Sequence, residues 1–210
     1  MALQTELVGA RFTSDGRLLT AAGASEYEDQ AREGLFLVNT STAVASVIAI
    51  PTTAHGLAIQ NQAEDGGVSI VIDKVGALMT VQTAATIPHA GIIGCLGQTR
   101  VALIADAALA IKSMNGLNQS TGSTVKSLLT GTALDAVTGV AANWFPIGGT
   151  FAASVSTLPG YQQVVRVDGE IVVAPGRMFA LHTLAAAVTS SAQLFIWFHL
   201  KKLPLGVTLR

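Results

Sequence analysis

The stretch Gln162–Pro175, QQVVRVDGEIVVAP, decides the fold class of this chain. Two runs rich in valine and isoleucine flank the pair Asp168-Gly169, and β-branched residues of this kind favour strands. An Asp-Gly pair supplies the positive φ angles that a two-residue turn between antiparallel strands needs. The stretch therefore predicts a β-hairpin, and it is the strongest hairpin signal in the sequence.

Two further strands are predicted on the C-terminal side of this stretch. After Pro175-Gly176, the runs RMFALHTL (177–184) and QLFIWFHL (193–200) are separated by the polar residues Thr189, Ser190 and Ser191. The second run is apolar on both faces. A strand without a polar face is expected either in the centre of a core or beneath another subunit.

The N-terminal side also favours strands, with one exception. The segments 56–61 (GLAIQN), 69–75 (SIVIDKV) and 78–83 (LMTVQT) are short, rich in β-branched residues and separated by turn formers. The segment 100–114 is rich in alanine and has apolar residues at helical spacing, which predicts a helix. We predict an all-β, antiparallel sandwich of jelly-roll type with one short helix near 100–114.

Charge divides the chain into two regions. Residues 1–33 hold 9 of the 25 charged residues, which leaves 16 for the 177 positions of residues 34–210. We predict a charged N-terminal arm or edge element over 1–33, with a turn at Ser14–Gly16, and a jelly-roll domain over 34–210. The alternative for residues 1–33 is a loose tail.

Composition limits the function of the chain. The sequence is 50% hydrophobic and only 12% charged, with a formal net charge of −1, so no basic field is available to bind nucleic acid. The long uncharged runs, including 75–99 and 136–165, are interrupted by Gly, Pro and polar residues, which argues against a membrane span. The N-terminus lacks the apolar core of a secretory signal, so we expect none. We therefore predict no nucleic-acid partner and no membrane partner.

The residues that carry chemistry form no familiar reactive pattern. Phosphate-binding glycine loops and the G-x-S-x-G motif are absent from the sequence. Cys95 lies in GIIGCLG, whose glycines indicate close backbone approach or turns, and a buried apolar thiol is the default for a lone cysteine. The histidines are His55, His89, His182 and His199. Of these, His182 and His199 lie on the last two predicted strands, where a two-histidine metal site is the sharpest hypothesis and packed histidines are the default.

Other enzyme and ligand classes find only partial support. The segment APGRMFALH (174–182) matches half of a cupin metal motif. Asp168 is expected to be a turn residue, and Asp135 has no assigned role in glycoside hydrolysis, which needs two carboxylates. For sugar stacking, Trp144 beside Asn143 is the better surface candidate of the two tryptophans. We predict a non-enzymatic protein with no catalytic, cofactor-binding or metal-ligating residue and no cofactor.

Several segments together resemble a family of virus proteins. The segments are LFLVNTSTAVASVIAIPTT, SIVIDKVG, a loop with NWFP, VVRVDGEIVVAPG and the closing AQLFIWFHLKKLPLG, and they cover roughly Leu35 to Gly206. Their layout is similar to that of jelly-roll structural proteins of tailed-bacteriophage virions, especially head decoration or cement proteins. The resemblance implies no catalytic residues.

The same resemblance implies where the chain works and with what. It implies a virion protein, assembled in the host cytoplasm, that forms a homotrimer on the capsid. Its partner is then the major capsid protein or another virion protein. The alternative is a tail or head-fibre component, or a carbohydrate-binding or receptor-binding module of the virion. A poorly charged domain fits subunits that cover one another, because obligate interfaces are more hydrophobic than ordinary surfaces.

Overall fold

Strands form all the regular structure in the described part of the chain. The computed structural model describes residues 11–12, 18–19, 34–51, 56–64, 67–82, 91–97, 109–114, 121, 125–129, 144–148, 162–185 and 190–202. The strands are β1 (Arg11–Phe12), β2 (Leu18–Leu19), β3 (Phe36–Asn39), β4 (Val44–Ala45), β5 (Leu57–Asn61), β6 (Ser69–Gln82), β7 (Gly91–Leu96), β8 (Ile111–Ser113), β9 (Val125–Leu129), β10 (Trp144–Gly148), β11 (Gln162–Val173), β12 (Met178–Leu184) and β13 (Ser190–Lys201).

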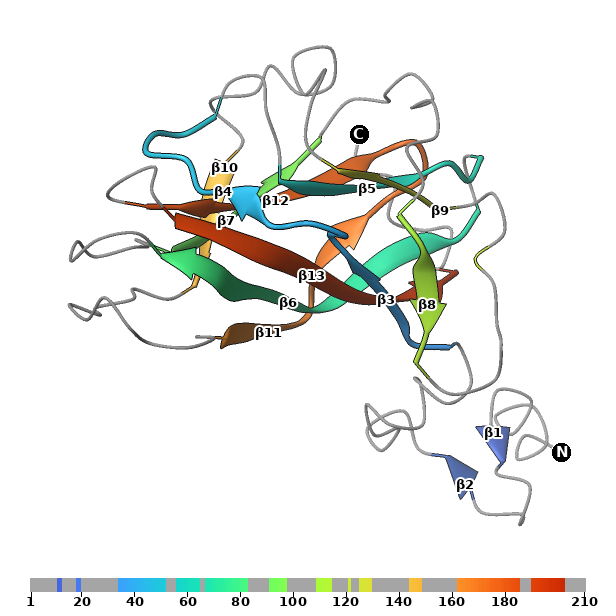
Figure 1. Ribbon diagram of the computed structural model, residues 1–210. Helices are drawn as coiled ribbons and strands as arrows, with labels where there is room; N and C mark the ends of the chain where they lie inside the picture. The colour runs from blue at the N-terminus through green and yellow to red at the C-terminus, as the bar shows by residue number, and fades with distance from the viewer. Residues whose placement is uncertain are drawn as a thin grey trace, which may run out of the picture.

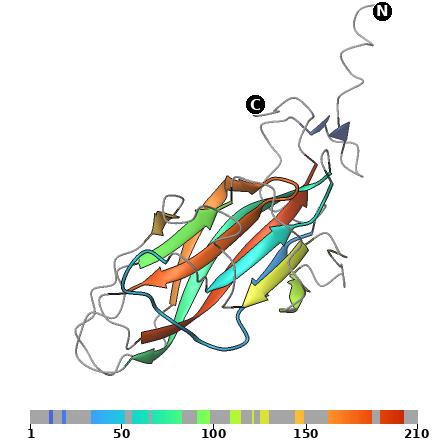
Figure 2. The same cartoon turned by 90° about the horizontal axis from the view of Figure 1, so that it is seen from above.

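Two antiparallel sheets pack face to face (Figures 1 and 2). One sheet has five strands in the order β10-β7-β12-β5-β9. The other has six strands: five in the order β11-β6-β13-β3-β8, with β4 also paired to β13. The predicted all-β antiparallel sandwich is therefore confirmed.

The strand order is that of a jelly roll. When β4, β8 and β9 are set aside, eight strands remain, in the orders β3-β13-β6-β11 and β5-β12-β7-β10. The chain passes between the sheets at almost every step, and the first and last of the eight strands are neighbours in the same sheet. This double-sheet arrangement of eight antiparallel strands defines the jelly roll. The strands β8 and β9 extend the two sheets next to β3 and β5.

The last strand, β13, lies in the middle of its sheet. It pairs along its whole length with β6 on one side and with β3 and β4 on the other. Its side chains alternate between buried and half-buried from Ser190 to Phe198. Of the two alternatives expected for this run, the central position is the one found, since the strand has neighbours on both sides in its sheet. Cover of its outer face by another subunit stays a prediction.

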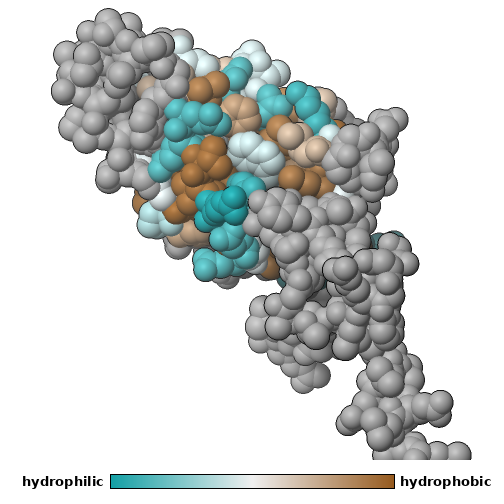
Figure 3. Space-filling view, turned by 90° about the horizontal axis from the view of Figure 1, so that it is seen from below, coloured by the Kyte–Doolittle hydropathy of each residue, from teal (hydrophilic) through white to brown (hydrophobic). Residues whose placement is uncertain are grey.

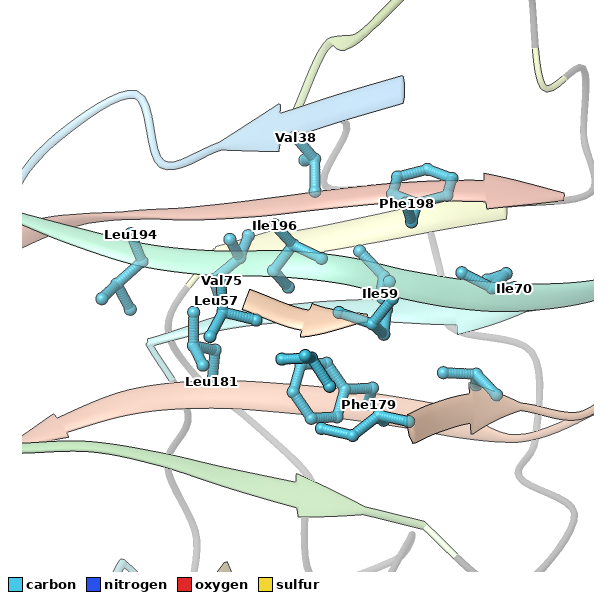
Figure 4. Packing of buried hydrophobic residues seen from close by; sticks show 14 of the residues in the cluster. Val38, Leu57, Ile59, Ile70, Val75, Phe179, Leu181, Leu194, Ile196 and Phe198 are labelled. Carbon is cyan, nitrogen blue, oxygen red and sulfur yellow. The ribbon is translucent and has the colours of Figure 1, made fainter. Parts of the chain in front are cut away.

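The core lies between the two sheets (Figure 4). The five-stranded sheet contributes Leu57, Ile59, Phe179 and Leu181, and the six-stranded sheet contributes residues such as Ile196. All of these side chains are fully buried. Burial of one side chain of this size contributes roughly 1.5–3 kcal/mol, so this shared core is the main link between the sheets.

The Asp-Gly pair at 168–169 has the predicted backbone conformation but does not form the predicted hairpin turn. Both residues have positive φ, 48° at Asp168 and 80° at Gly169. However, Arg166 pairs with Lys74 and Ile171 pairs with Ile72, so one strand continues past the pair along β6. The predicted hairpin is therefore wrong, and the Asp-Gly pair lies in a β-bulge. The bulge is on an edge strand of the sheet, where bulges are common.

Two other expected boundaries also differ from the structure. Residues 69–75 and 78–83 were predicted as separate strands, but Ser69–Gln82 is one strand that pairs continuously with β13 apart from two register shifts. The predicted helix over 100–114 is not found in its described part: Ile111–Ser113 is strand β8, paired with β3, while residues 100–108 lie outside the described residues. In Ile111–Ser113, pairing with a sheet edge prevails over the predicted helix.

Pro175-Gly176 forms a turn between β11 and β12. Gly176 has a φ of 75°, and the backbone N–H of Arg177 donates to the carbonyl of Ala174 at 3.0 Å. Proline followed by a glycine with positive φ is typical of a type II turn. The buried side chain of Asn61 supports this corner, since its Nδ2 donates to the carbonyls of Val68 and Val173, both at 2.9 Å.

The N-terminal segment, residues 1–33, contributes one small element outside the two packed sheets. Strand β1 pairs with β2, with Arg11 opposite Leu19 and Phe12 opposite Leu18. Both ribbon views draw this pair beyond the end of the sandwich (Figures 1 and 2). The predicted turn at Ser14–Gly16 lies outside the described residues. The boundary between residues 1–33 and 34–210 stays a prediction, although all strands of the packed sheets follow it.

Candidate functional site: an aromatic face on the six-stranded sheet

The outer face of the six-stranded sheet carries two large aromatic side chains. Leu194, Ile196 and Phe198 belong to the core, so the alternate residues Phe195 and Trp197 point away from it. Their ring centroids are 5.8 Å apart, and the ring planes are 24° apart. Both side chains are half-buried, so neither is sealed inside the domain.

A glycine on the neighbouring strand makes room for this aromatic pair. Gly76 lies opposite Phe195 on one side and opposite Val164 on the other. A Cβ atom at Gly76 would lie 3.3 Å from Cζ3 of Trp197 and 3.4 Å from Cγ2 of Val164. Trp197 therefore approaches the backbone of β6 closely, and Val164, which is 44% exposed, extends the apolar surface to the sheet edge.

Cations lie in the same row as Trp197. The register places Arg166, Lys74, Trp197, Leu37 and Lys112 side by side across five strands. The side chains of Arg166 and Lys112 are exposed. The Nζ of Lys112 donates to Oδ1 of Asn39 at 3.5 Å. We call the surface formed by Phe195, Trp197, Val164, Leu37 and these three cations the aromatic face.

The space-filling view shows where hydrophobic and hydrophilic residues lie on this side of the protein. Figure 3 looks at the underside of Figure 1, the side on which β6, β11 and β13 lie, and hydrophobic residues there alternate with hydrophilic ones. Aromatic residues and arginine are the types enriched at protein–protein interfaces. The composition of the aromatic face therefore suits binding to another macromolecule.

A buried polar pair lies next to this face. Nδ1 of His199 lies 3.0 Å from Oδ1 and 3.1 Å from Oδ2 of Asp73. A carboxylate only accepts hydrogen bonds, so the ring nitrogen is the donor to the ionised form. The register explains the pair: Trp197 pairs with Lys74 and Phe198 with Ile72, which leaves Asp73 as an extra residue in a bulge of β6.

The two histidines of the metal hypothesis are not brought together as neighbouring strand positions. His182 is on β12 of the five-stranded sheet, whereas His199 is on β13 of the six-stranded sheet. The Nδ1 of His182 accepts a hydrogen bond from the backbone N–H of Thr183 at 2.8 Å. No three His, Cys, Asp or Glu side chains are grouped to hold a metal ion within the described residues. His55, His89 and Asp135 lie outside them.

Trp144 is not the surface tryptophan. It begins strand β10, pairs with Cys95 and is only 9% exposed, so the prediction that NWFP forms a surface loop is wrong. Its Nε1 has no hydrogen-bond partner within the structure as described. Trp197 is the more accessible of the two tryptophans, a difference that only the strand register reveals. Asn143, the expected neighbour of a bound sugar, lies outside the described residues.

The outer face of the five-stranded sheet, in contrast, carries a buried hydrophobic cluster. Ile93, Cys95, Trp144, Met178 and Ala180 form a second buried cluster there together with Ala58. Cys95 is thus a buried thiol, as predicted. Of the two explanations offered for the glycines of GIIGCLG, turns in a loop are wrong, since Gly91–Leu96 is strand β7. Its glycine at position 94 still allows close approach, since a Cβ atom there would lie 2.5 Å from Cδ1 of Ile147.

The sequence comparisons with protein families and with curated proteins give no match. In the described ranges, no helix is long and apolar enough to cross a membrane. The candidate site therefore depends on its own geometry, which is that of a binding face.

Proposed function

We propose that this protein is a non-enzymatic structural protein of a bacteriophage virion, a decoration or cement protein of the head. In this proposal it assembles as a homotrimer on the major capsid protein, in the host cytoplasm, and stabilises the shell. The observation that carries the proposal is the aromatic face, which leaves Phe195 and Trp197 half-buried on the outside of a jelly roll.

The contrast between the two outer faces supports an assembly role. The five-stranded sheet has a buried cluster on its outer side, whereas the six-stranded sheet presents aromatic, aliphatic and cationic side chains on its outer side. Large aromatic side chains carry much of the binding energy in protein interfaces. A subunit that binds its neighbours through the aromatic face would cover this surface and add buried area to the shell.

The first test measures the native mass of the purified chain. We expect three times the 21.5 kDa mass of one chain by light scattering. The variant Trp197→Ser should shift the equilibrium toward smaller species, because it removes an aromatic contact from the interface. The matched control is Glu64→Ser, at an exposed position away from the aromatic face. A wild-type chain that is monomeric at all concentrations would contradict the proposal.

The second test locates the chain on the particle. A reconstruction of the virion that carries this chain should show trimers on the head lattice, and heads assembled without the chain should break at a lower temperature. Density on the tail or on a head fibre would replace the cement role with the alternative role. Heads of unchanged stability without the chain would also contradict the cement role.

A further inference from the structure

The N-terminal segment contains an element that needs a surface to pack against. The two-residue strands β1 and β2 pair with each other, and three of their four residues are apolar: Phe12, Leu18 and Leu19. An isolated two-stranded pair is at best marginally stable in water. Both ribbon views place the pair away from the two sheets of its own chain (Figures 1 and 2).

The N-terminal segment and the rest of the chain have opposite charge. Residues 1–33 contain six acidic residues and three arginines, a net charge of −3. Residues 34–210 contain nine Lys and Arg residues and seven acidic ones, a net charge of +2. Four of the six acidic residues of the segment are concentrated just before the domain, at Glu26, Glu28, Asp29 and Glu33.

Three of the nine Lys and Arg residues in the range 34–210 lie on the aromatic face. Arg166, Lys74 and Lys112 lie in one row with Trp197, and Lys201 follows further along β13. Lys74, Arg166 and Lys201 also take part in other interactions within the chain. The attraction for an acidic segment therefore comes from the summed positive charge of the row and not from one unpaired side chain. Acidic residues on the same strands are Asp73, which pairs with His199, and Asp168 and Glu170 at the bulge of β11.

The length of the segment allows it to reach another molecule. It joins the domain at Gly34, directly before β3, which lies beside β13 in the six-stranded sheet. Thirty-three extended residues span at most about 110 Å. A 12-residue strand such as β13 is about 40 Å long, so the segment exceeds the length of the sheet.

We propose that residues 1–33 of one copy bind the aromatic face of a second copy. The apolar residues of β1 and β2 would pack on Phe195, Trp197 and Val164, and the acidic run 26–33 would lie along the cationic row. This inference rests on the proposed function: the homotrimer proposed there would form through this contact. Charge complementarity of this kind favours the correct partner and accelerates association.

Charge reversal in the full-length chain tests the contact. The segment variant carries Glu26→Lys, Glu28→Lys and Asp29→Lys, and the face variant carries Lys112→Glu and Arg166→Glu. We expect each variant to raise the dissociation constant of the oligomer at least tenfold in sedimentation at low salt. The combined variant should recover most of this loss, because the two signs are then exchanged and remain complementary.

The matched control reverses an exposed charge away from the face, with Glu64→Lys, and should leave the dissociation constant unchanged. Circular dichroism of every variant checks that the sandwich is folded. If the segment and face variants assemble as the wild type does, the inference is overturned and the proposed function stands. A monomeric wild type ends both.

Cross-linking identifies which copy supplies the segment. A carbodiimide couples carboxylates to lysine amines without a spacer, and a mixture of 14N-labelled and 15N-labelled chains distinguishes links between copies from links within one copy. We expect mixed-isotope links from the acidic run 26–33 to Lys112 or Lys74. Links found only within one copy, or only to lysines away from the aromatic face, would overturn the inference.

Discussion

Asp73 and His199 are buried titratable side chains that contact each other, with exposed fractions of 6% and 9%. Each satisfies the other on the outer side of the central strands. Removal of one partner leaves a buried polar group without its hydrogen bond, which is more costly than loss of the pair as a whole. The pair therefore stabilises the site next to the aromatic face.

A substitution series tests the role of this pair. We expect Asp73→Ala to lower the free energy of unfolding by about 2–4 kcal/mol, measured by denaturant titration. The double variant Asp73→Leu, His199→Leu should lose less than Asp73→Ala, because neither member of the pair is then buried without the other. Glu170→Ala, at an exposed position, serves as the control. Equal losses in the single and double variants would contradict this account.

For single residues, the sequence predicted the burial of Cys95 correctly but not which tryptophan is accessible. Cys95 is buried, as its apolar neighbours indicated. The two tryptophans were assigned the wrong way round, because both lie in apolar runs and only strand register decides which one reaches solvent. Trp144 pairs with Cys95 beneath a closed surface, whereas Trp197 lies over Gly76 on an open one. Nothing in the sequence near Asp73 indicates the bulge that brings it to His199.

Strand β11 shows how a turn signal can be correct locally and wrong in its consequence. Asp168 and Gly169 do adopt positive φ, which the Asp-Gly pair predicted. Whether such a pair reverses the chain depends on the partner strand. Here the residues before and after Asp168-Gly169 both pair with β6, so the chain does not turn back. Ile111–Ser113, at the end of the predicted helix, is a similar case, because β3 offers it an edge.

The bulge gives a prediction for this element. Gly169→Val places a β-branched residue at a φ of 80°, where its Cβ would also lie 3.3 Å from Cγ1 of Val71. We expect a loss of about 1–2 kcal/mol in the free energy of unfolding. The control Asp168→Asn should change it by less than about 0.5 kcal/mol, since asparagine tolerates the same conformation. A neutral Gly169→Val would show that the bulge can rearrange.

For the whole molecule, each sheet contains one of the two tryptophans, Trp144 in β10 and Trp197 in β13. The variants Trp197→Phe and Trp144→Phe therefore give fluorescence signals from the five-stranded and the six-stranded sheet separately. Because both sheets contribute to one core, we expect the fluorescence midpoint of each variant to match its own circular dichroism midpoint. A difference between the two probes in either variant would mean that the sheets unfold independently.

The difference between the two outer faces also gives the molecule a front and a back. One side is sealed over Trp144 and Cys95, and the other offers Trp197 and Phe195. In the proposed function, a sandwich that binds its neighbours through the aromatic face joins a lattice in one orientation. Every copy on a shell would then turn its sealed side in the same direction, so an epitope or cargo fused to that side would be displayed uniformly over the particle.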